Sequence, residues 1–380
     1  MKLTSILKGI VKWTFRLAVV GLFLVFLFVF VAYWRSTNDC GKTAAPTHPM
    51  KAIVYCDYGT ADVLKLEDIE KPVPNDDQLL VKVHAVAVNP FDWHFMRGTP
   101  YLMRMETGLR KPKSPRLGVD FAGTVEAVGK NVTNFKAGDE VFGGKRGAFA
   151  EYITIRADSG VALKPANISF EQAGSVAIAG MTALQAVRDN GKVQPGQKVL
   201  INGASGGVGT FAVQIAHSFG ANVTGVCSGR NIDMVKSLGA DQVIDYTKED
   251  FTKGGQKYDV ILDNVPNHSL ADCRKVLTSN GRYIMIGGGG PNDGNWIGPF
   301  GRVIHAVLIK PFIKQEMGMM MADPSQKDYA IMADLMQVGK VTPVIDRTYP
   351  LSQTADAIRY LEEGHARGKV VIIVAQDNKT

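Results

Sequence analysis

One stretch of the chain, "VLINGASGGVGTFAVQIA" at residues 199–216, has residue types and spacing that suit phosphate binding. A β-type run enters it, a glycine-rich turn follows, and an apolar-periodic helix leaves it. Glycines remove the Cβ atoms that would block a pyrophosphate, and a helix N-terminus offers free N–H groups. This context predicts a dinucleotide site formed by Gly203, Ser205, Gly206, Gly207, Val208 and Gly209. A purely structural glycine turn is the alternative.

The next β-type run, "NVTGVCSGRN" at residues 222–231, distinguishes between the two nicotinamide dinucleotides. Folds that prefer NAD usually place Asp or Glu about 20 residues after the glycines, to hold the ribose 2′-hydroxyl. Here the run ends in Ser228 and Arg230, without a carboxylate. A hydroxyl and a guanidinium suit a 2′-phosphate, so the sequence predicts NADPH. For Arg230, a solvated charge at a helix start is the alternative.

The elements that would position this site alternate between strands and helices from about residue 169, where Ser169 is placed as the N-cap of a helix running to about residue 189. Apolar strands such as "KVLING", "QVIDY" and "YDVILDNV" are separated by helical runs. This alternation indicates a parallel sheet covered on both faces, a doubly wound α/β fold. We expect this cofactor domain to span residues 169–320.

Short β-type runs dominate the region before it, residues 50–168, as in "LLVKVHAVAV" and "FAGTVEAVG". The chain is predicted to return to this strand-rich domain over residues 321–376, closing with the strand "KVVIIVA". The apolar segment 301–322 admits three interpretations: a second membrane contact, a lid over an apolar pocket, or a helix packed on the second domain or at a dimer contact.

Together with "AVAVNPFDWHFMRG", "LGVDFAGTVEAVGKNV", "FKAGDEVFG", "LGADQVIDY" and the final "GKVVI", these features resemble the medium-chain dehydrogenase/reductase superfamily, in its zinc-free quinone oxidoreductase-like branch. The resemblance covers about residues 50–375. It implies a GroES-like catalytic domain beside a Rossmann domain, with NADPH-dependent reduction of quinones or activated carbon–carbon double bonds. It also implies a homodimer.

The resemblance and the side-chain chemistry give three catalytic candidates. Related enoyl reductases carry a Tyr proton donor about a dozen residues after the "VNP" turn, which here points to Tyr101; a pocket wall or surface aromatic is the alternative. His94 could transfer a proton near neutral pH, or be a packed or solvated side chain. Asn89 would lie near the nicotinamide, or only hold its turn.

The resemblance further suggests cofactor contacts from Thr182, Tyr246, Asn264, Val265, Gly287 and Gly288. Tyr246 could stack on adenine or reach the 2′-phosphate, with a buried Tyr at a strand end as the alternative. The glycines after Ile286 would let the backbone approach the nicotinamide ring, or form a flexible loop.

No metal is predicted. Zinc dehydrogenases of this superfamily place a Cys where this chain has Asn89 and a His where it has Val119. Because catalytic zinc normally takes three protein ligands, we expect none here. The four cysteines are far apart and form no C-x-x-C pair, which indicates unpaired thiols in a reducing compartment.

The run "LAVVGLFLVFLFVFVAYW" at residues 17–34 has no charge and approaches the length of a bilayer's hydrocarbon core. It predicts a single-pass anchor over residues 1–35, followed by a linker at 36–49; a cleaved signal peptide and a surface-lying helix are the alternatives. Residues 1–49 carry +5 of the net charge of +7, which favours anionic lipid over nucleic acid. The positive-inside rule places the enzyme outside, but its need for NADPH favours a cytoplasmic catalytic domain.

The function predicted is therefore a membrane-anchored NADPH-dependent reductase of small electrophiles, either quinones or α,β-unsaturated carbonyls, lipid-derived ones included. Two alternatives remain: an NADPH-binding adaptor without turnover, and a zinc-free alcohol or ketone dehydrogenase.

Overall fold

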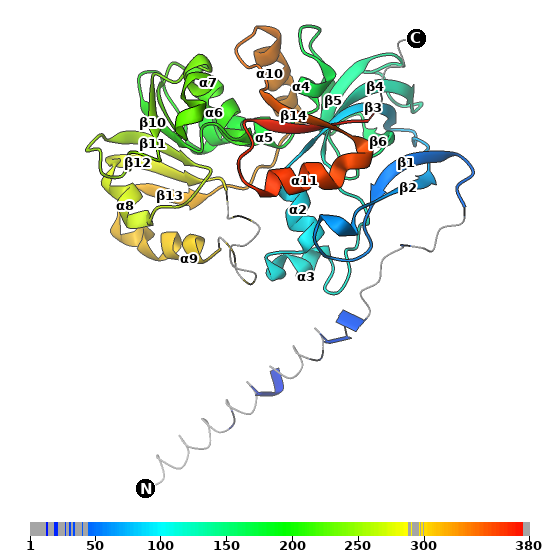
Figure 1. The fold of residues 1–380 in the computed structure, drawn as a ribbon, viewed down its shortest axis with the longest axis horizontal. Helices are drawn as coiled ribbons and strands as arrows, with labels where there is room; N and C mark the ends of the chain where they lie inside the picture. Colours follow the sequence, from blue (N-terminus) through cyan, green and yellow to red (C-terminus); the bar gives the residue numbers. More distant parts are fainter. Residues whose placement is uncertain are drawn as a thin grey trace.

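A computed structural model of the 380-residue chain describes residues 45–287, 290, 296, 298 and 300–374. It also describes Trp13, residues 19–21, Leu27, Phe30, Val31, Tyr33, Trp34 and Cys40. Two β-sheets with their covering helices make up the body of the molecule (Figure 1).

The first sheet has seven strands, in the order β14-β15-β3-β4-β5-β7 with β6 paired to β3. Its strands are β3 (Gln78–Val88), β4 (Asp120–Val128), β5 (Glu140–Gly144), β6 (Tyr152–Arg156), β7 (Val161–Leu163), β14 (Ile345–Pro350) and β15 (Lys369–Ile373). β15 pairs antiparallel with β3, so the last strand lies beside the strand that leads into Asn89. A separate hairpin pairs β1 (Pro49–Val54) with β2 (Lys65–Glu70).

The second sheet has six parallel strands in the order β10-β9-β8-β11-β12-β13. They are β8 (Lys198–Asn202), β9 (Asn222–Cys227), β10 (Gln242–Asp245), β11 (Tyr258–Asp263), β12 (Leu277–Met285) and β13 (Glu316–Met319). The chain winds outward from β8 in one direction and from β11 in the other. The carboxyl ends of β8 and β11 therefore form the switch point at which open α/β sheets bind ligands.

Helices cover both faces of this second sheet because successive strand residues point to opposite sides. In β8, Val199 and Ile201 pack in the core that includes α6, whereas Leu200 packs in the core that includes α8.

The α-helices of the described residues are α2 (Pro90–Arg97), α3 (Arg104–Thr107), α4 (Phe170–Ala173), α5 (Ala179–Gln185), α6 (Gly207–Ser218), α7 (Ile232–Ser237), α8 (Leu270–Lys275), α9 (Phe300–Ile309), α10 (Gln326–Gln337) and α11 (Thr354–Glu362). Short helical turns are η1 (Ala61–Val63), η2 (Tyr101–Met103), η3 (Ala186–Asn190), η4 (Gly229–Asn231), η5 (Lys310–Phe312) and η6 (Leu351–Gln353).

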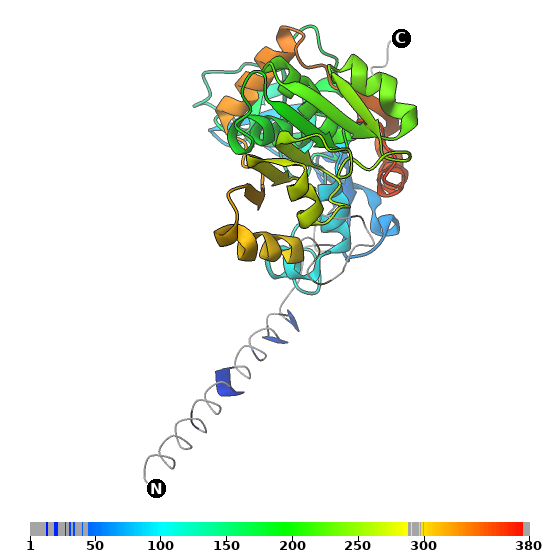
Figure 2. The same ribbon diagram turned by 90° about the vertical axis from the view of Figure 1, so that its left-hand side faces the viewer.

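The structure tests two sequence expectations for helices. The helix predicted to begin after Ser169 is broken into α4 and α5, although the Ser169 side chain does accept a hydrogen bond from Gln172 N as an N-cap. The apolar segment 301–322 forms most of α9, η5 and the edge strand β13. α9 lies beside β13 and buries Ala306, which confirms the interpretation of a helix packed on the second domain (Figure 2).

The membrane prediction is overturned. Spanning the hydrocarbon core takes about 20 consecutive apolar helical residues. Within the part of the chain that the structure describes, no helix is both long and apolar enough to do this. The predicted localisation, a single-pass protein with its catalytic domain facing the cytoplasm, is therefore wrong. Most of residues 17–34, on which it rested, lie outside the described residues.

The expectation of unpaired cysteines is wrong for two of the four. Cys40 and Cys56 form a disulfide, with Cα atoms 5.7 Å apart. The bond ties Cys40 to the residue two places after β1, a proximity that separations along the sequence do not reveal. Cys227 and Cys273 are free and buried, and burial raises the pKa of both thiols.

Candidate functional site: a dinucleotide cradle beside a buried Asn–Lys–Asp network

The glycine-rich turn lies at the switch point, between the end of β8 and the start of α6. Gly203 has φ +77°, a conformation that favours glycine, and its N–H donates to Val226 O at 3.1 Å. A Cβ on Gly209 would lie 2.1 Å from Gly203 O, so the helix can approach the strand only without one. The structure thus places all six predicted phosphate-loop residues in this turn and the first turn of α6.

The carboxyl ends of β11 and β12 meet the same turn. A Cβ on Gly203 would lie 2.8 Å from Val265 Cγ2, and one on Gly287 would lie 2.1 Å from Asn264 O. Three predicted contacts, Asn264, Val265 and Gly287, are therefore gathered next to the phosphate loop. Gly288 lies outside the described residues. Thr182 is on α5, which packs against α6.

Asp263, which the sequence analysis did not single out, holds this edge together. Its side chain is fully buried and accepts hydrogen bonds from Asn202 Nδ2 at 2.8 Å and from Tyr283 Oη at 2.5 Å. Val265 N also donates to it, at 3.2 Å. One carboxylate thus links the ends of β8, β11 and β12. Its place at the end of the "YDVILD" run was the available signal.

The end of β9 presents the residues predicted to recognise a 2′-phosphate. Arg230 is exposed, and its Nη2 donates to His365 O at 2.9 Å. Ser228 Oγ accepts from Asn231 Nδ2 at 3.2 Å, and the same nitrogen donates to Ser205 Oγ at 3.1 Å. Asn231, not predicted from the sequence, therefore joins the phosphate loop to the end of β9.

Two side chains at the end of β10, Asp245 and Tyr246, complete this end of the cradle. Tyr246 follows the strand and is 55% exposed, so it is not the buried tyrosine that was the alternative. Asp245 lies beneath Gly229, where a Cβ on the glycine would be 2.7 Å from Asp245 Oδ2. Hydrogen bonds from the hydroxyl and N–H of Thr247 keep the pKa of Asp245 below its usual value.

Asn89 is buried at the end of β3 and has all of its polar groups engaged. Lys369 Nζ donates to Asn89 Oδ1 at 2.5 Å, Asn89 Nδ2 donates to Ala87 O at 3.2 Å, and Asn89 N donates to Asp92 Oδ2 at 2.8 Å. Lys369 Nζ also lies 3.3 Å from Asp120 Oδ2, with both side chains almost completely buried. We call Asn89, Asp92, Asp120 and Lys369 the Asn–Lys–Asp network.

The network holds two carboxyl groups around one ammonium group. Burial raises the pKa of Asp92 to about 7, and it raises the pKa of Asp120 as well. The network also reaches the cofactor cradle. A Cβ on Gly207 would lie 3.2 Å from Lys369 Cδ, and Gly368 N donates to Ser205 O at 2.9 Å. The "GKVVI" and "LGVDFAG" motifs contained Lys369 and Asp120, but nothing in the sequence paired them.

The two candidate proton donors, His94 and Tyr101, differ in whether their polar atoms already have a hydrogen-bond partner. His94 Nδ1 is 2.7 Å from Thr99 O, and burial lowers the pKa of the ring, so it is neutral and engaged. Tyr101 is half-buried, and its ring meets Trp296 edge-on at 5.6 Å between centroids. Within the described part of the chain its hydroxyl has no hydrogen-bond partner. Tyr101 therefore contacts the segment that follows β12 in the chain.

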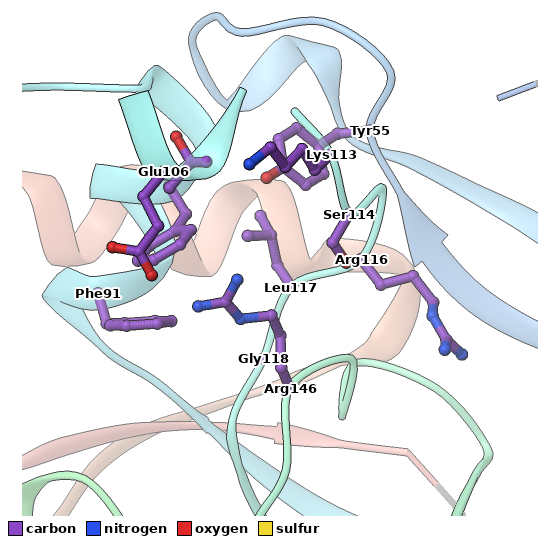
Figure 3. A pocket seen from close by; sticks show the side chains of 11 residues that line it. Tyr55, Phe91, Glu106, Lys113, Ser114, Arg116, Leu117, Gly118 and Arg146 are labelled. Atoms are coloured by element: carbon purple, nitrogen blue, oxygen red, sulfur yellow. The ribbon is translucent and has the colours of Figure 1, made fainter. Parts of the chain in front are cut away.

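A cavity of about 90 Å³ opens beside α2, close to Asn89. Aromatic and charged side chains line it, and Figure 3 shows those of Phe91, Arg146, Glu106 and Lys113 directed toward the same space. The Gly118 backbone also lines it, and Gly118 N donates to Asp92 Oδ1 at 2.9 Å. Gly118 thus lies between the cavity and the Asn–Lys–Asp network, which it contacts through Asp92.

The residues at the switch point fit a dinucleotide. A Cβ on Gly206 would find only Gly203 O at 3.5 Å, so the space before α6 is open. Asn231 Oδ1 and Asn264 Oδ1 are buried acceptors without a partner among the described residues, one on each side of the loop. Buried acceptors without a hydrogen-bond donor are rare in folded proteins, so these two oxygens are available to donors of a bound group. Ser205, Gly206 and the α6 amides would hold the pyrophosphate.

Metal ligands are not gathered here. Asn89 and Val119 occupy the positions at which the resemblance would require Cys and His. Among the described residues, no group of three or more His, Cys, Asp or Glu side chains is placed to hold a metal ion.

Family models match two parts of the chain. The model described as alcohol dehydrogenase GroES-like domain matches residues 75–166, and the one described as zinc-binding dehydrogenase matches residues 238–372. Both are components of the medium-chain dehydrogenase/reductase fold.

Individual relatives agree with these models. The chain is 34% identical to a chloroplast envelope quinone oxidoreductase homolog of Arabidopsis thaliana, covering 85% of this chain and 98% of the relative. It is 36% identical to a 2-methylene-furan-3-one reductase of Solanum lycopersicum, covering 85% and 79%. Among solved structures, the quinone oxidoreductase from Coxiella burnetii superposes with a TM-score of 0.73 at 32% identity, covering 86% of this chain and 100% of that one.

Proposed function

This chain belongs to the quinone oxidoreductase-like members of the medium-chain dehydrogenase/reductase superfamily and is an oxidoreductase; on that premise we propose that it uses NADPH, without zinc, to reduce quinones or α,β-unsaturated carbonyl compounds. The observation that carries the proposal is the junction between the glycine-rich turn and the Asn–Lys–Asp network, through Ser205, Gly207 and Lys369.

The substrate class follows from the side chains that replace a zinc site. Asn89 and Val119 cannot supply the Cys and His ligands of a catalytic zinc, so zinc would not polarise a simple carbonyl here. Quinones and enones accept hydride more readily because the developing charge spreads onto oxygen. The printed names of the relatives, quinone oxidoreductase and 2-methylene-furan-3-one reductase, describe acceptors of this kind.

A bound nicotinamide dinucleotide supplies the hydride, and the chain supplies position and a proton. Asn89, with its side-chain oxygen and nitrogen both engaged, holds the turn between β3 and α2. Tyr101 is the proposed proton donor because its hydroxyl is free within the described residues and its ring contacts Trp296, in the segment that follows β12. His94 is assigned to fixing the Thr99 carbonyl.

The choice of NADPH rests on Ser228 and Arg230. Arg230 is exposed after the end of β9, and the guanidinium donors that do not bind His365 O are available to a phosphate. The Asp245 carboxylate lies nearby but already accepts two hydrogen bonds from Thr247. We therefore assign 2′-recognition to Ser228 and Arg230. Thr182, Asn264, Val265, Gly287 and Gly288 remain proposed contacts of the cofactor, and a homodimer and lipid-derived substrates remain predictions.

The test is cofactor consumption by the purified protein with 1,2-naphthoquinone, a short enal and a simple ketone in parallel, each with NADPH and with NADH. We expect NADPH oxidation with the quinone or the enal, little with the ketone, and no loss of activity after treatment with a chelator.

The alternatives give different results in the same experiment. Binding of NADPH without oxidation by any acceptor would favour an adaptor without turnover. Preferential reduction of the ketone, with alcohol-dependent reduction of NADP⁺, would favour a dehydrogenase. Either result would overturn the proposal.

A further inference from the structure

The cavity beside α2 has a wall of stacked rings. Phe91 and Phe95, one helical turn apart, stack with their centroids 4.1 Å apart. The Arg146 guanidinium lies over both, 5.4 Å from the Phe91 centroid and 4.2 Å from that of Phe95. We call this cavity the Arg146 pocket. Phe91 and Phe95 lie on α2, the helix that Asn89 caps, so the pocket lies next to the proposed reaction site.

Positive charge prevails around the Arg146 pocket. Arg146, Lys113 and Arg116 line it together with a single carboxylate, Glu106. In the part of the chain that the structure describes, no carboxylate lies within ion-pair distance of Arg146 or Arg116. The Arg146 guanidinium is directed into the pocket, whereas that of Arg116 points away (Figure 3). Ring contacts leave the N–H donors of Arg146 available, since they use only the face of the guanidinium.

A neutral donor completes the lining. Tyr55 is 2% exposed, and its hydroxyl has no hydrogen-bond partner among the described residues. Its side chain reaches into the space between Lys113 and Leu117 (Figure 3). Burial raises the pKa of this hydroxyl above its ordinary value, so it keeps its proton. An acceptor that enters the pocket would give this O–H donor a hydrogen-bond partner.

The volume of the Arg146 pocket limits the size of the group that it can bind. A cavity of about 150 Å³ holds a benzene ring. The Arg146 pocket, at about 90 Å³, would receive a substituent rather than the reacting ring. Donors at Arg146 and Tyr55, with Lys113 at the rim, match an oxygen-bearing anionic substituent such as a carboxylate or an ionised hydroxyl.

We propose that the Arg146 pocket binds an anionic oxygen substituent of the substrate, so that the preferred acceptors are acidic quinones and acidic α,β-unsaturated carbonyl compounds. This assignment rests on the proposed function. Arg146 is the main anion-binding residue, Tyr55 adds a hydrogen bond, and Glu106 opposes the anion.

The experiment compares benzylideneacetone with its para-carboxylated analogue, which differ only in the anionic group and not in the reacting double bond. We expect kcat/KM to be about tenfold higher for the carboxylated enone, as for a charge-assisted hydrogen bond to an exposed guanidinium. In the Arg146→Gln variant the preference should fall to about unity, and Arg146→Lys should retain part of it. Glu106→Gln should increase it, because a like charge is removed.

Lys145→Gln is the matched control, since Lys145 is the neighbouring exposed cation and does not line the pocket. It should leave the preference unchanged; an equal loss in this variant would show long-range attraction only and overturn the assignment. Equal kcat/KM for the two enones in the wild-type protein would also overturn it, while leaving the proposed function intact.

A binding measurement separates this inference from the proposed function. Calorimetric titration of the wild-type protein with benzoate should show binding that Arg146→Gln weakens about tenfold. If the protein reduces no acceptor but binds benzoate in this way, the proposed function fails and the anion site stands. If benzoate does not bind, or binds equally to Arg146→Gln, the inference fails.

Discussion

At the scale of single residues, Arg230 carries the proposed preference for NADPH. Its guanidinium is exposed and anchored through one N–H to His365 O, which leaves its other donors for a 2′-phosphate. Arg230→Ala should raise KM for NADPH about tenfold, equivalent to about 1.4 kcal/mol, and change KM for NADH by less than about twofold. Steady-state kinetics with both cofactors check this, and an equal effect on both would contradict the assignment.

Asp92 should give the protein a recognisable pH dependence. Burial raises its pKa from 3.8 to about 7, so between these values the folded state binds a proton that the unfolded chain has lost. Stability contributed by this group therefore falls as pH rises through that window and is constant above it. Two charged groups face Asp92 and also shift its pKa: Asp120 raises it and Lys369 lowers it.

Asp92→Asn removes this titration. The unfolding free energy of the variant minus that of the wild type should increase with pH from about 4 to about 7 and then level off. Urea unfolding across this range measures it. A difference that is independent of pH would show that Asp92 is ionised throughout.

At the scale of elements, the contact between β11 and β12 fixes the edge that would face the nicotinamide. Tyr283 of β12 donates to the buried Asp263 carboxylate at the end of β11. Tyr283→Phe should cost about 1–3 kcal/mol, because it removes a hydrogen-bond donor from a buried carboxyl group. Tyr360 donates to Asp346 at 2.7 Å in a half-buried position, so Tyr360→Phe is the matched control and should cost less than about 1 kcal/mol.

Urea unfolding of the two variants gives the comparison. Tyr283→Phe should also raise KM for the cofactor, because Asp263 positions Val265 and Asn202, whereas Tyr360→Phe should not. Equal costs in the two variants would mean that burial of Asp263 adds nothing to the strength of its hydrogen bond.

At the scale of the whole molecule, the sequence predicted what local patterns encode. The alternating runs predicted β8 to β12 and the helices between them, and the glycine spacing predicted the turn at Gly203. What it missed are side chains joined across long stretches of chain. Lys369 meets Asn89 because β15 pairs with β3, and a disulfide joins Cys40 to Cys56 on the other side of β1 in the sequence.

The wrong predictions, a membrane anchor and four unpaired cysteines, arose because local sequence patterns do not report contacts in the fold. The apolar composition of residues 17–34 suggested an anchor, but composition alone does not establish a spanning helix. Unpaired cysteines were inferred from their separation along the chain, which says nothing about distance in the fold. Asn231 and Asp263 could have been noticed beside Arg230 and Asn264. Their distant partners could not, because Ser205 lies in the turn after β8 and Asn202 and Tyr283 lie on other strands.

The central claim is that this fold transfers hydride to a conjugated acceptor, and analysis of the products tests it most directly. The protein would react anaerobically with NADPH and either 1,2-naphthoquinone or a short enal, in the presence of a chelator. We predict one molecule of hydroquinone or of saturated aldehyde for each NADPH oxidised. An unsaturated alcohol from the enal, or cofactor binding without any reduced product, would contradict the account.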